Sequence, residues 1–360
     1  MEPLKEMFNR NFYERLADAL HQAHNNIHPG KFIKDAVKNL DDMSLNQRLR
    51  NTSIIMKKHF PDDFLKSVSI MEKTITMLPK GYTTLIFPDF VALYGLDNYD
   101  ASLDALAFFT SFGSSEFAIR EFLKRDFSRT IKVMETWAKD KNHHVRRLAS
   151  EGSRPRLPWS FKLDEVIQNP RLTRNIIEQL KTDETLYVRK SVANHLNDFS
   201  KDHPAYMLQI LGNWDGANPH TAWIMKHACR TLIKKGDKDA LKLFSFELNV
   251  KAVLANLSLS RKTLKLGDTL EFHFDICSTS KAPQKLVIDY RVHYSRKTES
   301  SSKVFKLKEV VLDPGSRISF SKRQVFRDFS TRKHYPGTHA VEILVNGQVL
   351  GREEFELTVV

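Results

Sequence analysis

Apolar side chains recur at helical spacing over about the first 250 residues of the chain. Near the N-terminus they lie four residues apart and would share one face of a helix, as in Phe8, Phe12, Leu16 and Leu20. Helix starts are also visible: Asn169 can cap free backbone amides, and Pro170 then occupies the first helical position, where its missing N–H costs nothing. The pattern predicts that helices dominate residues 1–250.

The periodicity changes to two from about Lys251. The stretches "TLEFHFDI" (269–276) and "KLVIDYRVHY" (285–294) alternate apolar and polar residues, which is typical of half-buried strands. Asn346 and Gly347 tolerate positive φ and form a strong signal for a two-residue hairpin turn. Roughly seven short strands without a helical pattern predict a small β-sandwich of immunoglobulin type.

The helical part also repeats itself. "DKNHHVRRLASEG" (140–152) resembles "DETLYVRKSVANH" (183–195) at an offset of 43 residues, and "WIMKHACRTL" (223–232) is a weaker echo. This period matches HEAT-like helix pairs, each of which buries its apolar face against the next and leaves a concave surface. Because 360 residues suffice for two cores, we expect a HEAT-like helical solenoid at residues 1–250 and an all-β immunoglobulin-like sandwich at residues 251–360.

An excess of positive charge narrows the class of partner. The formal net charge is +13 and the isoelectric point is near 9.5, although the hydrophobic content of 41% is that of an ordinary globular protein. Basic residues occupy equivalent positions in the two clearest repeats, namely Arg146, Arg147, Arg189 and Lys190. A helical array with regular basic residues is suited to a regular polyanion, and the backbone of a DNA duplex is the obvious candidate.

A second basic cluster lies in the predicted sandwich. Residues 321–335 read "SKRQVFRDFSTRKHY" and combine five basic residues with Phe326, Phe329 and Tyr335. The basic residues are Lys322, Arg323, Arg327, Arg332 and Lys333. They could hold phosphates while an aromatic side chain contacts a base. The alternative, which stays open, is a solvated basic edge that prevents strand aggregation.

Residues 143–160, "HHVRRLASEGSRPRLPWS", combine four arginines with two prolines and a tryptophan. The helix is expected to end near Gly152 as its C′ residue, and the prolines then hold Arg154, Arg156 and Trp159 in an extended turn. We expect Arg154 and Arg156 to hold DNA phosphates from this turn. Trp159 is either a core residue, as most tryptophans are, or an aromatic face that stacks on a base or sugar.

Together these features resemble the DNA alkylation repair glycosylases of the AlkC type, which are relatives of the AlkD group. The resemblance rests on "LASEGSRPRLPWS", the N-terminal "LKEMFNRNFYERLA", the helical repeats and the appended β-domain, so it covers essentially the whole chain. It implies a monofunctional DNA glycosylase of base excision repair. The implied substrates are 3-methyladenine and 3-methylcytosine in double-stranded DNA. The resemblance further implies that the helical repeats bind the DNA and that the N-glycosidic bond is hydrolysed without a base-flipping pocket.

The implied reaction needs two kinds of protein group. Methylation makes the base cationic and a good leaving group, and breaking its glycosidic bond leaves an oxocarbenium-like sugar. A carboxylate would stabilise that positive charge and orient water, and an aromatic face tolerates a cation. On the AlkC pattern the residues near the lesion are Glu116, Asp198 and Trp159, with Arg147 at the DNA-facing end of its helix. Arg147 can alternatively pair with Glu151 one turn on.

Each candidate carboxylate also has a structural interpretation. Glu116 is expected in the first turn of a helix, where the helix dipole favours an anion. Asp198 is expected at a helix end that disfavours an anion, yet exposed aspartates are common at helix ends. Glu121 is more simply explained as the i,i+4 partner of Arg125.

Other chemistry finds little support. Cys229 and Cys277 are the only cysteines, so neither a disulfide framework nor a cysteine zinc site has its ligands. The fourteen histidines show no metal-binding spacing, and there is no phosphate-cradling glycine-rich loop. No apolar run approaches the roughly 18 residues of a membrane helix. We expect a cytoplasmic monomer with no metal and no cofactor that acts on DNA and not at a membrane.

A hypothesis of a different class stays open. The same features describe a non-catalytic HEAT-repeat scaffold that binds DNA or a protein, with Glu116 and Asp198 as surface charges. Release of a base from methylated DNA separates the two hypotheses, because a scaffold would bind DNA without releasing a base above the spontaneous rate.

Overall fold

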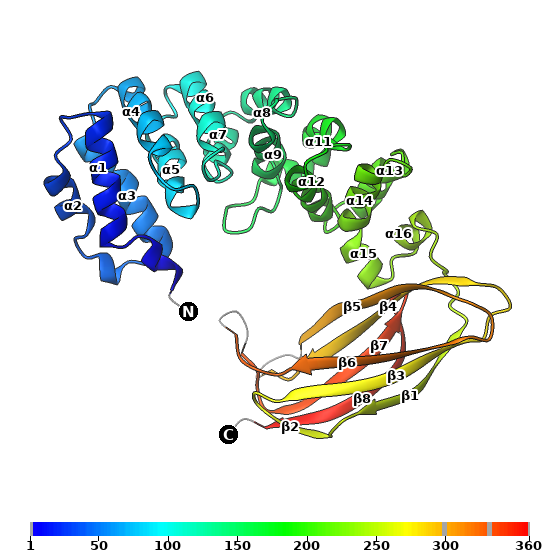
Figure 1. Cartoon of the computed structure of the whole chain (residues 1–360). Coiled ribbons are helices and arrows are strands. Elements are labelled where there is room, and N and C mark those ends of the chain that lie inside the picture. Colours follow the sequence, from blue (N-terminus) through cyan, green and yellow to red (C-terminus); the bar gives the residue numbers. More distant parts are fainter. Residues whose placement is uncertain (1–2, 297–300, 330–332, 359–360) are drawn as a thin grey trace. The chain divides into compact units, whose positions relative to one another are not determined.

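The computed structural model describes residues 3–296, 301–329 and 333–358 (Figure 1). Its last helix ends at Leu243, and its first strand begins at Ala252. The predicted order, a helical repeat region followed by a β-sandwich, is confirmed.

Contacts between residues divide the chain into two units. The helical unit comprises residues 1–207 and 214–228, and the sandwich unit comprises residues 208–213 and 229–360. The last two helices of the chain therefore pack with the strands. A domain boundary between residues 250 and 251 stays a prediction.

The described residues contain sixteen α-helices and four short 3-10 helices. The α-helices are α1 Arg10–Ala23, α2 Pro29–Ala36, α3 Leu45–His59, α4 Phe64–Thr76, α5 Ile86–Tyr94, α6 Tyr99–Phe109, α7 Ile119–Arg125, α8 Phe127–Trp137, α9 His143–Gly152, α10 Asp164–Gln168, α11 Arg174–Leu180, α12 Leu186–Phe199, α13 Pro204–Gly212, α14 Pro219–Ala228, α15 Arg230–Lys235 and α16 Lys238–Leu243. The 3-10 helices are η1 Leu4–Met7, η2 Leu40–Asp42, η3 Tyr82–Leu85 and η4 Pro170–Thr173. No helix among the described residues is long and apolar enough to cross a membrane.

Nine helices of the helical unit from α4 onward stand in two rows (Figure 1). One row contains α4, α6, α8 and α11, and the other contains α5, α7, α9, α12 and α14. The apolar face predicted near the N-terminus is confirmed, because Phe8, Phe12, Leu16 and Leu20 are all buried. Asn169 accepts a hydrogen bond from the amide of Arg171 (3.2 Å), as expected of a cap, although the helix begins with the 3-10 turn η4.

The predicted repeat is visible in the hydrogen bonds of α9 and α12. In α9, Arg146 donates to the backbone carbonyls five and six residues before it, both at 3.0 Å. In α12, Arg189 donates to the carbonyls in the same two relative positions, at 2.7 and 3.0 Å. An arginine thus closes the turn before the helix in both repeats.

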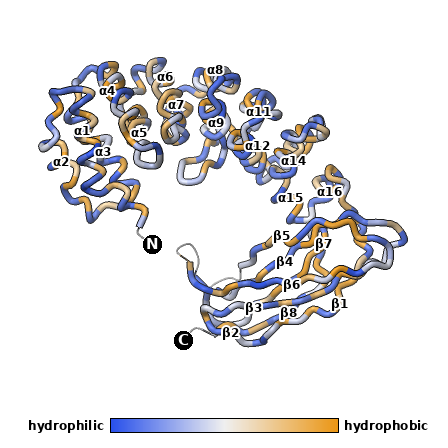
Figure 2. The backbone as a smooth tube through the Cα atoms, viewed as in Figure 1, coloured by the Kyte–Doolittle hydropathy of each residue, from blue (hydrophilic) through white to orange (hydrophobic). Residues whose placement is uncertain are grey.

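The sandwich unit packs two sheets against each other. The strands are β1 Ala252–Leu259, β2 Thr263–Lys265, β3 Thr269–Ser278, β4 Gln284–Tyr294, β5 Ser301–Leu312, β6 Arg317–Val325, β7 Gly337–Val345 and β8 Gln348–Thr358. One sheet has the strand order β1-β3-β6, and the other has the order β2-β8-β7-β4-β5. Apolar residues concentrate along β4 and β7, which lie inside the larger sheet (Figure 2).

The hairpin predicted at Asn346 and Gly347 is confirmed. These two residues join β7 to β8 and have φ values of 47° and 80°. A side chain at Gly347 would place its Cβ 2.3 Å from Cα of Gly236, the residue after α15. Both glycines thereby allow the hairpin turn and the end of α15 to approach closely within the sandwich unit.

Candidate functional site

A cavity of about 610 Å³ opens in the helical unit where five segments of chain meet. They are the loop before η3, η3 itself, the connection from α6 to α7, helix α9 with the loop that follows it, and the start of α12. We call this cavity the site cavity. Its charged lining residues are Lys80, Glu116, Arg147, Glu151 and Arg154, and its aromatic ones include Trp159 and Tyr187.

A chain of alternating charges runs from the site cavity into the protein. Glu116 pairs with Arg147, whose Nη2 lies 3.6 Å from Oε1 of Glu151. The same Oε1 accepts a hydrogen bond from Nη1 of Arg154 (2.6 Å), and Nε of Arg154 donates to Oδ2 of Asp198 (2.9 Å). We call these five residues the arginine–carboxylate chain. The predicted pairing of Arg147 with Glu151 is present, yet it is only one link of a longer series.

Glu116 lies at the cavity end of this chain. It sits in the turn before α7, three residues ahead of Ile119, and not in the first turn of the helix as expected. The Ser114 hydroxyl donates to its Oε2 (2.6 Å), and Arg147 binds the same oxygen. The negative charge of Glu116 is therefore stabilised mainly by Arg147 and not by the helix dipole at the start of α7.

Asp198 lies at the buried end. It occupies the last turn of α12, and burial raises the pKa of its carboxyl even though Arg154 is bonded to it. Lys201 approaches its other oxygen at 3.8 Å. The interpretation of Asp198 as an exposed helix-end residue is wrong. Asp198 is not among the residues that line the site cavity, and it meets that cavity through Arg154.

Trp159 is 77% exposed, so the interpretation of this residue as core is wrong. Its backbone has a φ of 66°, a left-handed conformation that bulky residues rarely adopt. Such strain persists only where the surrounding structure imposes it, and it gathers at functional sites. The indole lines the site cavity and two neighbouring cavities.

Arg120 imposes the shape of the loop that carries Trp159. Its fully buried guanidinium donates to the carbonyls of Gly152 (3.0 Å), Arg154 (2.7 Å) and Phe161, and burial lowers its pKa to about 10. The loop is thus held at both ends from α7. Arg120 is not among the residues predicted from the sequence, where it is one of two charged residues between the apolar Ile119 and Phe122.

Gly152 was expected to be the C′ residue of α9, with the backbone freedom that this position requires. It is instead the last helical residue, and it has no positive φ. A Cβ at this position would lie 2.5 Å from Cγ2 of Ile119. The glycine therefore serves close packing of α9 against α7.

Most arginines predicted to bind DNA in the helical unit already have partners within the protein. Arg146 binds both oxygens of Asp183 (2.6 and 3.2 Å), and Arg156 binds both oxygens of Asp202 (2.9 Å each). Arg189 closes the turn described above. Lys190 differs from these arginines, because its side chain is exposed.

The basic cluster of the sandwich unit is arranged differently. Its described members are exposed, and two of them lie on β6, an edge strand of the smaller sheet: Lys322 and Arg323, with Arg327 and Lys333 following. Arg332 lies outside the described residues. Phe326 is fully buried and cannot reach a base, whereas Phe329 is about half exposed with Arg327 over its ring at 5.2 Å.

The described residues contain no group of three or more His, Cys, Asp and Glu that could hold a metal ion. Burial raises the pKa of the Cys229 thiol to about 12, so this cysteine is not poised as a nucleophile.

Two family models match this chain. Residues 108–232 match the family model described as DNA alkylation repair enzyme, and residues 253–359 match that of the YhaZ C-terminal Ig-like domain. The immunoglobulin type predicted for the sandwich is therefore confirmed. The chain is 37% identical over 359 residues to "Uncharacterized protein YhaZ" of Bacillus subtilis (strain 168), which covers 99% of this chain and 100% of that protein.

Among solved structures, the chain is similar to Pseudomonas fluorescens alkylpurine DNA glycosylase AlkC bound to DNA containing an abasic site analog. The TM-score is 0.96 at 44% identity, and the match covers 99% of this chain and 100% of that chain.

Proposed function

This chain belongs to the AlkC-type family of DNA alkylation repair enzymes, and from that membership we propose that it is a monofunctional DNA glycosylase of base excision repair. The proposed substrates are cationic N3-methylated bases, 3-methyladenine and 3-methylcytosine, in double-stranded DNA. The proposed reaction hydrolyses the N-glycosidic bond and leaves an abasic site. A monomeric state and a cytoplasmic location belong to the same proposal.

The observation that carries the proposal is the meeting of Glu116 and the exposed Trp159 in one cavity. Within the described residues, the bonds to the Glu116 carboxylate all end on Oε2. Oε1 therefore remains for water or for the sugar. A carboxylate that is oriented by Arg147 and Ser114 before substrate arrives can stabilise positive charge without reorganising.

Bond cleavage then proceeds as follows. The base leaves with the electron pair of the glycosidic bond, which discharges its positive charge, and the sugar becomes oxocarbenium-like at C1′. Glu116 stabilises that cation and accepts a proton from the water whose oxygen bonds to C1′. Since the leaving group is good, stabilisation at the sugar suffices, and the resemblance implies cleavage without a base-flipping pocket.

Asp198 and Trp159 have supporting roles in this proposal. Asp198 holds Arg154, and through Arg154 and Glu151 it orients Arg147 against Glu116. Trp159 packs against the exposed nucleotide and attracts the cationic base through its ring face.

The test is base release from methylated duplex DNA by the unsubstituted protein, Glu116→Gln and Asp198→Asn, with binding to abasic DNA measured in parallel. We expect Glu116→Gln to lower the rate on the order of 100-fold. Asp198→Asn should give a smaller decrease, because Asp198 acts through other side chains. Asp104→Asn is the matched control, since Asp104 is an exposed carboxylate of α6 outside the site cavity.

Retained DNA binding in Glu116→Gln would assign the glutamate to chemistry. If the unsubstituted protein releases no base above the spontaneous rate while binding DNA, the glycosylase proposal fails. The chain would then be a non-catalytic scaffold.

A further inference from the structure

Lys80 differs from the other cations that line the site cavity. Arg147 and Arg154 are each paired with two carboxylates of the arginine–carboxylate chain. Lys80 is exposed, and within the described residues it makes no ion pair. Its ammonium lies 5.2 Å from the centroid of the Phe112 ring. At this point of the cavity lining, positive charge is therefore available to an external anion.

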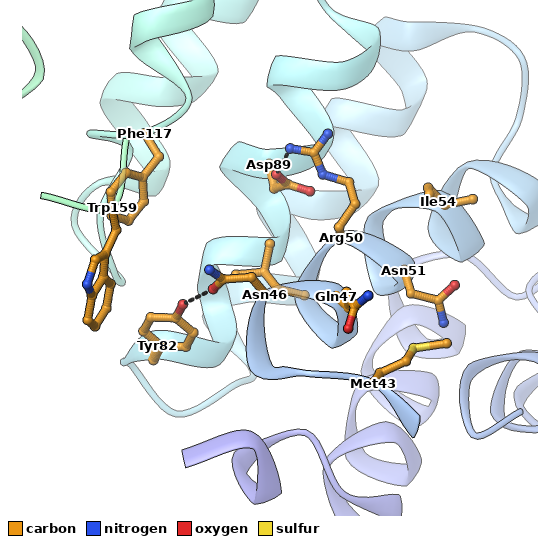
Figure 3. A pocket seen from close by; sticks show the side chains of 11 residues that line it. Met43, Asn46, Gln47, Arg50, Asn51, Ile54, Tyr82, Asp89, Phe117 and Trp159 are labelled. Carbon is orange, nitrogen blue, oxygen red and sulfur yellow. Dashed lines mark hydrogen bonds and ion pairs between the residues drawn. The ribbon is translucent and has the colours of Figure 1, made fainter. Parts of the chain in front are cut away.

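Cations in the helices beside the site have partners as well. Figure 3 shows from close by a neighbouring cavity of about 600 Å³, and among the described residues that line it Arg50 is the one cation. Arg50 points toward Asp89, and its Nη2 lies 2.9 Å from Oδ1 of that residue (Figure 3). At the end of α7, Arg125 was expected to pair with Glu121 but lies 3.9 Å from Asp97 instead. Lys80 therefore stands apart from its neighbours.

The loop that carries Lys80 is fixed to the segment that carries Glu116. Gly81 donates its amide to the carbonyl of Phe112 (2.9 Å). A Cβ at Gly113 would lie 3.0 Å from the carbonyl oxygen of Gly81, so the two segments approach as closely as a glycine allows. The position of the lysine relative to the proposed catalytic carboxylate is therefore set by the backbone of both segments.

The two segments are also anchored to neighbouring helices. Tyr82, in η3, donates its hydroxyl to Oδ1 of Asn46 in α3 (2.9 Å), as Figure 3 shows. Asn142, which caps α9, donates its side-chain amide to the hydroxyl of Ser111 in the connection from α6 to α7 (2.8 Å). The lysine and the proposed catalytic carboxylate are thereby held in one framework before DNA arrives.

The charge of Lys80 acts within the site cavity. His144 also lines the cavity, and its pKa is lowered first by burial and then by the charges of His143 and Lys80. The imidazole of His144 therefore stays neutral at pH 7. Of the two cavity-lining residues, only Lys80 carries positive charge.

A nucleotide at the proposed site brings an anion with it. The sugar of the lesion carries one phosphate on O3′ and another on O5′, so a sugar whose C1′ lies at Glu116 places phosphate within a few bonds of that carboxylate. Phosphate and carboxylate repel each other, and a nearby ammonium offsets this repulsion. Lysine is suited to this task, because it binds phosphate as a compact point charge.

We infer that Lys80 binds a backbone phosphate next to the lesion sugar. This inference rests on the proposed function, because it takes the position of the sugar from Glu116. The contact positions the sugar against the carboxylate through the DNA backbone alone. It makes no contact with the base and requires no displacement of the base from the stack.

Binding of a duplex that contains an abasic-site analogue tests the inference and requires no base release. The affinities of the full chain, Lys80→Ala and Lys132→Ala are measured by fluorescence anisotropy. Lys132 provides the matched control, since it is an exposed lysine of α8 outside the site cavity. We expect Lys80→Ala to weaken binding about tenfold and Lys132→Ala to leave it unchanged.

Neutral linkages then locate the contact. Two further duplexes each carry one methylphosphonate, which lacks the phosphate charge, on the 5′ or the 3′ side of the abasic site. One of these two should weaken binding by the unsubstituted protein by a similar factor. The same duplex should cause no further loss in Lys80→Ala, because that variant has already lost the other partner of the contact.

Unchanged binding by Lys80→Ala, equal weakening by Lys80→Ala and Lys132→Ala, or additive losses on both methylphosphonate duplexes would each overturn the inference. Should Lys80→Ala lower the melting temperature, Lys80→Gln keeps most of the side-chain length and takes its place. The proposed function is tested separately, because Glu116→Gln should lower the rate of base release while binding is retained. A chain that binds the abasic duplex through Lys80 and releases no base would lose the proposed function and keep the phosphate contact.

Discussion

Basic residues serve different ends in the two units of this chain. In the helical unit, the side chains of Arg147 and Arg154 are 12% and 8% exposed, and each is paired with two carboxylates. In the sandwich unit, Arg323 is 75% exposed, and its only carboxylate neighbour, among the described residues, lies 3.9 Å away in Glu271. In the sequence both groups are simply basic residues. In the structure the buried arginines of the helical unit position the carboxylates of the site, whereas the exposed basic residues of the sandwich unit remain available to an external anion.

The energetic consequence follows from burial. Removing one partner of a buried ion pair leaves an uncompensated charge in the interior. An exposed ion pair contributes little to stability, because water solvates each of its charges when the other is removed. Substitutions of the buried arginines in the helical unit should therefore act on stability and rate. Substitutions in the basic cluster of the sandwich unit should act on DNA affinity.

The largest effect is expected from Arg154→Leu. This change leaves Glu151 and Asp198 buried beside an apolar side chain, and we expect a loss of about 3–5 kcal/mol in the free energy of unfolding. Urea denaturation followed by tryptophan fluorescence measures the unfolding of the helical unit. All four tryptophans belong to that unit, namely Trp137, Trp159, Trp214 and Trp223.

Arg323→Leu is the matched control, since it removes the same charge from an exposed strand position and should change the stability by less than about 0.5 kcal/mol. Because Arg323 belongs to the sandwich unit, which has no tryptophan, hydrogen exchange of the β6 amides measures this stability. Equal losses in the two variants would erase the distinction between structural and available arginines.

A second test uses pH on the helical unit. His195 is fully buried, hydrogen-bonded to Ser150 and Thr173, and burial lowers its pKa to about 3. The native state then stays unprotonated while the unfolded chain binds a proton below about pH 6.5, so stability falls as the pH falls. From pH 7 to pH 5 we expect a loss of about 2 kcal/mol, again read by tryptophan fluorescence. His195→Gln should remove this dependence.

The sandwich unit should respond to the same change with the opposite sign. Burial raises the pKa of Asp289 in β4 to about 6, partly offset by Lys234 and Lys306. The native carboxyl binds a proton more tightly than the unfolded one, so stability rises as the pH falls through 6, by about 1 kcal/mol between pH 7 and pH 5. Hydrogen exchange of β4 amides reports it, and Asp289→Asn should abolish it. A fall of protection in β4 over this range would contradict the assignment.

The fold was largely predictable because it depends on local periodicity. The change of period near residue 251, the 43-residue repeat and the Asn346-Gly347 turn each follow from spacing within one segment, and each is present. Glu116 and Trp159 were found through the family resemblance, and the structure brings them to one cavity.

The charge pairing of the site could not be predicted in the same way. Arg147 and Glu116 are 31 residues apart, and Arg154 and Asp198 are 44 apart, so their contacts arise only when successive repeats stack. Trp159 is exposed with a left-handed backbone, in a loop that Arg120 of α7 holds on both sides of it. Local patterns give no information on either relation.

The smallest effect per residue, and the most direct test of the available charges, is the salt dependence of DNA binding. The logarithm of DNA affinity falls linearly with the logarithm of salt concentration, and removing the basic partner of one bound phosphate makes this slope shallower by about 0.9. We expect the double substitution Lys322→Ala and Arg323→Ala to reduce the steepness of the slope by up to about 1.8 on undamaged duplex DNA, measured by fluorescence anisotropy between roughly 50 and 200 mM salt. Arg189→Ala should leave the slope unchanged, because Arg189 donates to backbone carbonyls within its own repeat. If the Arg189 variant lowers the slope and the double variant does not, the β6 residues are a solvated edge and the helical arginines hold the phosphates.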